Sequence, residues 1–321
     1  MQQCCMVNHK VESSHIRLEP GGFITGLDDR PAFSLTAPKS LPIPVLITVP
    51  HAGRDYPSSL LAQMRDPDFA CLRLEDRYID EVAQAIADAT GAALITAHAP
   101  RAMLDLNRAR DDVDWEMIAG SKPHPVRHSQ ANRRARSGLG LVPRRLPGFG
   151  EIWREKLQHG ELARRIEGIH QPYHAATSRE LQRIRDEWGA ALLIDLHSMP
   201  PLRVSNDRPE PVQFVIGDRF GTACDGALVT RGCQYLESRG KGAALNRPYA
   251  GGFVLDTHSA PPLGIHALQL EVCRSIYLDA RLERPTARIA PLARLLAGLV
   301  RDLGEATARM GHGGDMRQAA E

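Results

Sequence analysis

Short apolar runs alternate with segments of helical hydrophobic spacing along most of the chain. Runs rich in Val, Ile and Leu at 45–49, 92–98, 190–198, 211–218 and 264–273 predict β-strands. Apolar residues spaced by three and four predict helices over 76–90, 153–188, 225–240 and 286–310. Because strands that are apolar throughout are covered on both faces, we expect an α/β fold, a three-layer α/β/α sandwich around a mainly parallel mixed sheet.

Two stretches depart from this alternation. Residues 1–40 contain several prolines and the pair Gly21-Gly22, and they predict an irregular N-terminal arm on the surface. We expect residues 41–321 to form one α/β domain, with a variable Arg/Gly/Pro-rich insertion at about 119–150. This insertion has three interpretations: a cationic lid, a nucleic-acid patch or a solvated loop. Its lack of interleaved aromatic residues favours the loop.

Composition excludes several classes of protein. The 321 residues carry a formal net charge of +2, which argues against a nucleic-acid partner or an anionic membrane surface. No window of about 18 residues is continuously apolar, and the N-terminus lacks the apolar core of a secretory signal. The six cysteines show no CxxC spacing, so we expect reduced thiols and a cytoplasmic location.

Ionisable side chains gather where the predicted strands end. His51 ends the first strand, His197 ends the third, and Glu271 lies near the end of the last. Asp76 opens the helix predicted after the first strand. Ligands bind at the carboxyl ends of strands in such sheets. Since zinc takes three His or carboxylate ligands and keeps a fourth position for water, this set suggests a catalytic metal, with the extra glutamate as a base.

Each of these residues also has a purely structural interpretation. A histidine after a strand is more often hydrogen-bonded than a ligand, and Asp76 as a helix cap would contribute about 1 kcal/mol. Glu271 differs, because an ionisable group inside the apolar strand 264–273 is rarely tolerated without a partner. The spacing is not a compact HExxH, so the spacing alone is a weak signal.

Several sequence blocks resemble one known family. The blocks are "VPHAG", "EDRYIDEVA", "RAMLDLNRAR", "IDLHS", "FGTACD", "NRPYAGGF" and "HALQLEVCRSIYLD". In this order, over about 44–280, they resemble the N-formylglutamate amidohydrolases, which are related to zinc carboxypeptidases. The resemblance implies a carboxypeptidase-like sandwich and metal-dependent hydrolysis of a small anionic N-acyl amino acid. The best-known activity of the family releases formate from N-formyl-L-glutamate, late in histidine breakdown.

The resemblance also implies a metal site. His51 and His197 resemble zinc ligands, and we expect one zinc, or another divalent metal, per chain. In the carboxypeptidases a glutamate three residues after the first histidine is the second ligand. Arg54 occupies that position here and cannot bind a cation. We therefore assign the carboxylate ligand to Asp76, with Glu75 as its close competitor.

Further roles follow from the same resemblance. Glu271 resembles the general base, Arg101 resembles the residue that polarises the substrate carbonyl, and the pair Asn107 and Arg108 resembles a clamp for the substrate carboxylate. The loop that contains Asn246, Gly251 and Gly252 is expected to close over the substrate. A glutamyl side chain needs a second cation, for which Arg54 and Arg247 are candidates.

Three functions remain open at this point. The first is hydrolysis of N-formyl-L-glutamate, and the second is deacylation of another N-acyl amino acid or cleavage of a peptide-like substrate on the same architecture. The third is a non-enzymatic module that binds an acidic ligand through Arg101 and Arg108. Metal content and formate release distinguish the third from the first two.

Overall fold

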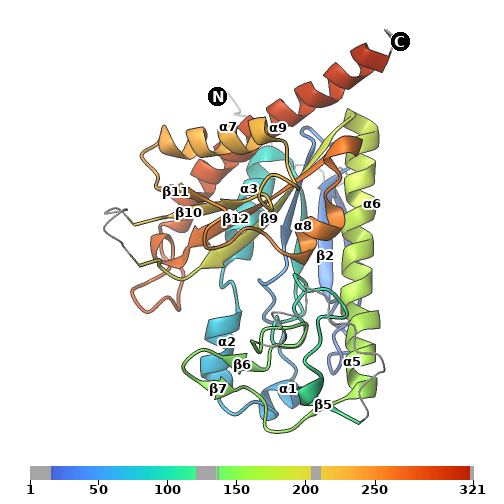
Figure 1. The fold of residues 1–321 in the computed structure, drawn as a ribbon, viewed down its shortest axis with the longest axis vertical. Helices are drawn as coiled ribbons and strands as arrows, with labels where there is room; N and C mark the ends of the chain where they lie inside the picture. Colours follow the sequence, from blue (N-terminus) through green and yellow to red (C-terminus); the bar gives the residue numbers. More distant parts are fainter. Residues whose placement is uncertain (1–15, 121–134, 136, 204–210, 319–321) are drawn as a thin grey trace, which may run out of the picture.

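A mixed sheet forms the centre of the computed structural model, which describes residues 16–120, 135, 137–203 and 211–318 (Figure 1). Its eight strands lie in the spatial order β1-β2-β4-β3-β9-β12-β10-β11. The four central strands β4, β3, β9 and β12 are parallel, whereas β1, β2 and β10 make antiparallel pairings. The strands are β1 (Ile16–Gly21), β2 (Phe33–Pro38), β3 (Val45–Val49), β4 (Ala93–Ala97), β9 (Ala191–Met199), β10 (Phe214–Gly217), β11 (Ala243–Leu245) and β12 (Ile265–Cys273).

Helices cover both faces of this sheet. The long helix α6 lies on one face, and α3, α7 and α9 lie on the other (Figure 1). The predicted three-layer α/β/α fold is therefore confirmed. The helices are α1 (Ser58–Ala62), α2 (Pro67–Leu74), α3 (Ile79–Thr90), α5 (His159–Arg165), α6 (Gln171–Trp188), α7 (Gly226–Glu237), α8 (Phe253–His258) and α9 (Ile289–Gln318).

Short elements form the rest of the described chain. β5 (Ile118–Ala119) pairs with β8 (Leu157–Gln158), and β6 (Arg145–Leu146) pairs with β7 (Gly150–Glu151). Three 3₁₀ turns lie at Trp115–Met117, Pro261–Leu263 and Arg274–Ile276, and a π-helical turn, Ile166–His170, joins α5 to α6. Within the described residues, no helix is both long enough and apolar enough to span a bilayer.

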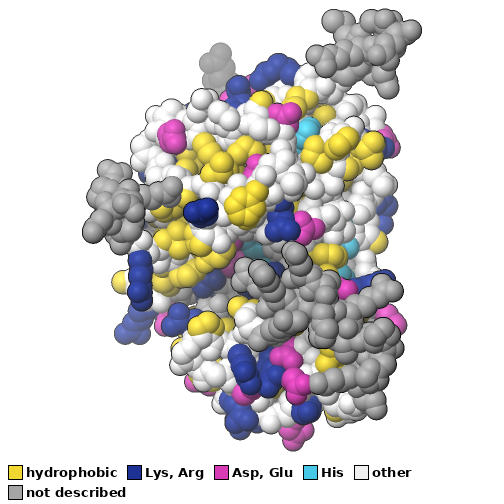
Figure 2. Space-filling view, in the orientation of Figure 1, with side chains coloured by type: hydrophobic (Ala, Val, Ile, Leu, Met, Phe, Trp, Pro, Cys, Tyr) yellow, Lys and Arg dark blue, Asp and Glu magenta, His cyan; other side chains and the backbone are white. Residues whose placement is uncertain are grey.

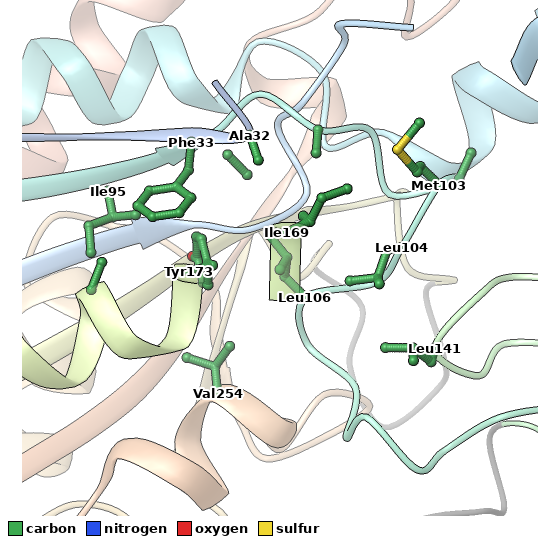
Figure 3. Packing of buried hydrophobic residues seen from close by; sticks show 14 of the residues in the cluster. Ala32, Phe33, Ile95, Met103, Leu104, Leu106, Leu141, Ile169, Tyr173 and Val254 are labelled. Carbon is green, nitrogen blue, oxygen red and sulfur yellow. The ribbon is translucent and has the colours of Figure 1, made fainter. Parts of the chain in front are cut away.

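Hydrophobic side chains fill the spaces between the layers. Beneath α6, the rings of Phe33 and Tyr173 meet edge to face at a centroid distance of 5.5 Å, in a cluster that also contains Ile95 and Val254 (Figure 3). On the opposite face, α3 and α9 pack against each other and against the apolar side of β3 and β9. α3 ends where Gly91 adopts a left-handed conformation at φ 71°, as predicted from its C-cap position.

The two central strands β9 and β12 change character along one face. In β9, Ala191 and Leu193 belong to the cluster beneath α6, and the next residues with the same parity are Asp195 and His197. β12 repeats the change: Ile265 and Ala267 are followed on that face by Gln269 and Glu271. On this face, the amino-terminal half of each strand therefore packs in the hydrophobic core, and the carboxyl-terminal half carries polar side chains.

Two regions differ from the expectation, and a third lies partly outside the described residues. Residues 16–38 are not an irregular arm, because β1 and β2 pair there and extend the sheet; residues 1–15 lie outside the described residues. Helix does not begin at residue 153, since β8 precedes α5. Of the insertion at 119–150, residues 121–134 and 136 lie outside the described part, so its interpretations as lid, patch or loop are untested.

Candidate active site

A cavity of about 350 Å³ opens at the carboxyl ends of β3, β9 and β12. Of the expected site residues, His51, Asp76, His197, Glu271, Arg101, Asn107, Arg108 and Gly252 line it. A hollow near the middle of the molecular surface exposes histidine and acidic side chains, with basic side chains near it (Figure 2). The structure thus brings together residues that lie more than 200 positions apart in the sequence.

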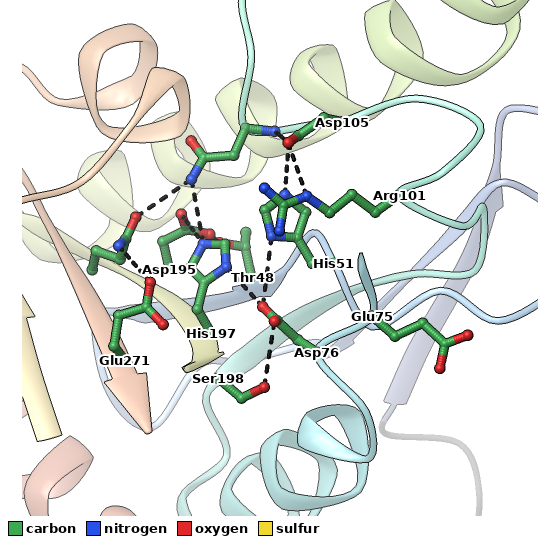
Figure 4. A network of polar contacts seen from close by, with 12 residues as sticks. Thr48, His51, Glu75, Asp76, Arg101, Asp105, Asp195, His197, Ser198 and Glu271 are labelled. Atoms are coloured by element: carbon green, nitrogen blue, oxygen red, sulfur yellow. Dashed lines mark hydrogen bonds and ion pairs between the residues drawn. The ribbon is translucent and has the colours of Figure 1, made fainter. Parts of the chain in front are cut away.

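Three buried side chains converge at the floor of the cavity. His51 follows β3, Asp76 lies between α2 and α3, and His197 belongs to β9. One ligand atom of each lies within 4.8 Å of the others. The Asp76 Oδ2 atom lies 3.6 Å from Nδ1 of His51 and 3.0 Å from Nδ1 of His197 (Figure 4). Both imidazoles therefore present the same nitrogen to the carboxylate.

A second carboxylate orients each histidine. Nε2 of His51 lies 2.7 Å from Oδ1 of Asp105, and Nε2 of His197 lies 2.8 Å from Oδ2 of Asp195 (Figure 4). An ionised carboxylate only accepts hydrogen bonds, so each Nε2 carries a proton, and Nδ1 is the nitrogen that would bind a metal in place of its own proton. Carboxylate–histidine pairs of this kind support metal-bound histidines, and the donor set fits a divalent metal such as zinc.

The geometry distinguishes Asp76 from Glu75. The Asp76 N–H donates to the backbone oxygen of His51 at 2.9 Å, and Arg274 donates to Asp76 Oδ1 at 3.1 Å. The Glu75 side chain points away from the histidines, and burial raises its pKa (Figure 4). Asp76 does not open a helix as expected: α1 and α2 intervene after β3, and α3 begins only at Ile79. Helix capping therefore does not explain its burial.

The electrostatics of this cluster favour a bound cation. Burial opposes ionisation of Asp76, but hydrogen bonds to His197 and His51 hold its pKa well below the ordinary value. Burial also opposes the charged form of His197, yet Asp195 and Asp76 raise its pKa well above the ordinary value. The imidazole of His197 holds a proton strongly because it lies between two buried carboxylates. The same negative surroundings also favour a metal cation.

Glu271 lies beside this cluster on the neighbouring strand. It pairs in register with His197, because β12 runs parallel to β9. Burial raises the pKa of Glu271 to about 7, while nearby His197 lowers it and Asp76 raises it further. The side-chain amide of Gln269 donates to Glu271 Oε1 at 3.0 Å. Glu271 is thus a carboxylate that exchanges a proton near neutral pH.

The segment 101–108 forms a second wall of the cavity. Arg101 donates through Nε to Asp105 Oδ2 at 2.9 Å; burial opposes its charge, but Asp105 raises its pKa, so the guanidinium stays ionised. Two histidines of the helical layer, His170 and His174, donate to the backbone oxygens of Arg108 and Leu106 at 2.9 and 3.0 Å. These bonds fix the wall against α6.

Asn107 makes protein contacts on both sides of its amide. Its Oδ1 accepts the Val254 N–H at 3.0 Å, and its Nδ2 lies 3.4 Å from Nε2 of His197 and from Oε1 of Gln269. A Cβ atom at Gly252 would lie 2.5 Å from Asn107 Oδ1, so glycine is required for this close approach.

Three expected substrate contacts lie elsewhere. Asn246 is not among the described residues that line the cavity; its Oδ1 accepts the Asp218 N–H, and its Nδ2 donates to Asp218 Oδ1 at 2.6 Å. Arg54 forms an ion pair with Asp80 at 2.7 Å, and neither Arg54 nor Arg247 is among the described lining residues. Asn246 instead stabilises the turn after β10, and its own backbone is left-handed, with φ at 57°.

Other cavity residues had no role in the sequence interpretation. Arg73, Tyr249, Gln269 and Arg274 line the cavity, and Arg274 also donates to Ser198 Oγ and to the Glu75 backbone oxygen. One sequence signal was available for Gln269: it stands two positions before Glu271, on the same face of an otherwise apolar strand. Arg73 and Arg274 carry no comparable signal, because tertiary contacts bring them to the cavity.

Comparisons with known proteins show which family this chain resembles. The model of the family described as N-formylglutamate amidohydrolase matches residues 43–278. An N-formylglutamate deformylase from Pseudomonas aeruginosa is 29% identical, covering 82% of this chain and 92% of the relative. One from Pseudomonas putida is 31% identical, covering 74% and 82%.

A solved structure extends the likeness to three dimensions. The crystal structure of N-formylglutamate amidohydrolase from Ralstonia eutropha JMP134 has 29% sequence identity and a TM-score of 0.74, and the match covers 88% of this chain and 97% of that one. Because the family model spans most of the sequence, the chain belongs to the N-formylglutamate amidohydrolase family.

Proposed function

We propose that this protein hydrolyses the amide bond of an N-acyl amino acid, with N-formyl-L-glutamate as substrate and formate and L-glutamate as products. Family membership and the names of both Pseudomonas relatives support this reaction. The observation that carries the proposal is the convergence of His51, Asp76 and His197 beside Glu271 in one cavity. An amide is a poor electrophile and water a poor nucleophile, so the site must activate both.

Zinc is the metal that we propose for this site. His51 and His197 would bind it through Nδ1, and Asp76 would bind it through a carboxylate oxygen. When bound, zinc polarises the substrate carbonyl and lowers the pKa of water from 15.7 towards ~7. Asp105 and Asp195 hold the two imidazoles in the tautomer that leaves Nδ1 free to bind.

Glu271 is the proposed general base. Its carboxylate accepts a proton from the attacking water and passes it to the nitrogen of the departing amino acid. Gln269 holds Oε1 of the carboxylate, so Oε2 is the oxygen available for this transfer. A pKa of about 7 suits the role, because the group both takes and releases a proton near neutral pH.

Two arginines of the second wall act on the substrate. The terminal amino groups of Arg101 donate to no other described residue, and they stabilise the negative charge that develops on the carbonyl oxygen. Removal of one such donor typically costs about 10²–10³ in rate. Arg108 holds the α-carboxylate, since a guanidinium binds a carboxylate through two parallel hydrogen bonds. The Gly252 loop covers the bound substrate.

Formate release from N-formyl-L-glutamate by the purified, zinc-loaded protein tests the proposal. A panel of N-formyl, N-acetyl and N-succinyl amino acids tests the acyl specificity. His51→Ala should abolish turnover, whereas Arg239→Ala, an exposed position outside the cavity lining, should leave it unchanged. A zinc-loaded wild type that releases no acid from any member of the panel would refute the reaction and favour a binding module.

A further inference from the structure

Among the described residues four arginines line the cavity, and three of them bind other groups of the protein. Arg101 pairs with Asp105, and Arg274 pairs with Asp76 and also donates to Ser198 Oγ. Arg108 donates to the backbone oxygens of Leu139 and Asn107 at 2.9 and 2.8 Å. These contacts fix the three guanidinium groups and use part of their hydrogen-bonding capacity.

Arg73 differs from these three arginines. It lies in the last turn of α2 and makes neither a hydrogen bond nor an ion pair with another described residue. Its guanidinium instead lies 5.1 Å from the centre of the Phe69 ring, and that ring stacks on Phe149 at 4.8 Å. A cation–π contact restrains a guanidinium without using its N–H donors. Arg73 is therefore positioned and still able to bind an anion.

The position of Arg73 complements that of Arg108. Arg73 stands three residues before Asp76, and Arg274 ties the end of α2 to that ligand by donating to the Leu72 and Glu75 oxygens at 3.3 and 2.5 Å. Arg108 belongs to the segment 101–108, on the His51 and Asp105 side. Arg73 and Arg108 therefore line the same cavity from two different segments of the chain.

We infer that Arg73 binds the side-chain carboxylate of the substrate and thereby selects N-acyl derivatives of acidic amino acids. The inference rests on the proposed function, in which Arg108 holds the α-carboxylate. A substrate with two carboxylates needs two cations, and an uncharged side chain would leave Arg73 without a partner. Neither Arg54 nor Arg247 supplies this second cation in the described structure.

The test compares N-formyl-L-glutamate with N-formyl-L-glutamine, which has the same shape and no side-chain charge. In the wild type, kcat/KM for N-formyl-L-glutamate should exceed that for N-formyl-L-glutamine by about 10–100-fold. This is the factor that one hydrogen bond to a charged group typically contributes. Arg73→Ala should bring this ratio close to one, mainly by raising KM for the glutamate derivative, and should change the turnover of the glutamine derivative much less. Arg73→Lys should restore part of the preference, and Arg73→Glu should reverse it.

Arg239→Ala is the matched control, because Arg239 is also exposed and lies over an aromatic ring, 3.5 Å from the centre of Tyr235. Its ratio should equal that of the wild type. The inference is overturned if the wild type has no preference for glutamate, if Arg73→Ala keeps the preference, or if both substrates lose turnover equally. In each of these cases the wild type still releases formate, so the hydrolase proposal stands. If the wild type releases formate from neither substrate, both proposals are refuted.

Discussion

Asp195 and His197 lie two positions apart on one face of β9, and their side chains are joined at 2.8 Å. The other oxygen of Asp195 accepts the Thr48 hydroxyl at 2.8 Å, so the carboxylate cannot rotate freely. Its position fixes the imidazole ring and directs Nδ1 towards Asp76. Metal affinity should therefore depend on a residue that does not touch the metal.

Asp195→Asn should lower the zinc affinity by about 10–100-fold, because a neutral amide supports the imidazole less strongly than a carboxylate does. Competition with a chromogenic chelator measures this change. Asp218→Asn is the control, since Asp218 is another buried carboxylate but bonds to Asn246 away from the cavity lining. Equal affinities in the wild type and Asp195→Asn would contradict the supporting role.

The variants Asp76→Asn and Glu75→Gln should differ in their affinity for zinc. Asp76 presents Oδ2 to both histidines, whereas Glu75 points away from them. Asp76→Asn should lose more zinc affinity than Asp195→Asn does, and Glu75→Gln should keep the wild-type affinity. Elemental analysis after dialysis provides the measurement. Retention of one zinc by Asp76→Asn together with its loss from Glu75→Gln would reverse the assignment.

Glu271→Gln should lower kcat by about 10²–10⁴, the usual contribution of a positioned acid–base group. The amide has nearly the same shape but cannot accept the proton of water. Zinc content should stay at the wild-type level, because Glu271 lies outside the group of proposed ligands. Steady-state formate release and elemental analysis on the same sample separate loss of the base from loss of the metal. A variant with full activity would exclude Glu271 as the base.

The pH dependence should follow the ionisation of Glu271. Burial raises its pKa to about 7, so the base form is lost as the pH falls through that value. A bound dication lowers this pKa, which places the acidic limb of kcat/KM at about pH 7 or below. Gln269→Leu removes a donor to the ionised carboxylate and should move the limb to higher pH. A limb that moves to lower pH in this variant would contradict the assignment.

Packing of α9 should contribute strongly to stability. Leu296 is fully buried in the cluster formed with α3 and the sheet, so Leu296→Ala should lower the free energy of unfolding by about 2–5 kcal/mol. Leu263→Ala, at a position that is 65% exposed, should change it by no more than about 0.5 kcal/mol. Urea denaturation followed by circular dichroism compares the two. Similar midpoints would show that α9 is not part of the cooperative core.

The central strands and α3 could be predicted because their patterns are long and continuous. β3, β9 and β12 are buried at every position, and most of their residues are apolar in the sequence. The pair β1 and β2 lacks this signal, since β1 is alternately exposed and both strands contain proline. α1 and α2 were missed because five and eight residues are too few to establish a helical period.

The strand-end rule was sufficient to select the candidate residues at the sheet. His51, His197 and Glu271 follow from it, because they belong to predicted strands or come directly after one. Asp76 was selected because it was expected to open the helix after the first strand, and its actual position between α2 and α3 could not be derived from periodicity. Arg73 and Arg274 were missed, since contacts between α2 and the end of β12 bring them to the cavity.

The parallel register of β9 and β12 places His197 directly beside Glu271. Side chains alternate between the two faces of a strand, so a slip of a single residue would turn Glu271 to the opposite side and replace it with a hydrophobic neighbour, Leu270 or Val272. A misaligned chain could still bury most of its apolar surface and yet be inert. Specific activity per folded molecule is therefore a sensitive gauge of correct strand alignment after refolding.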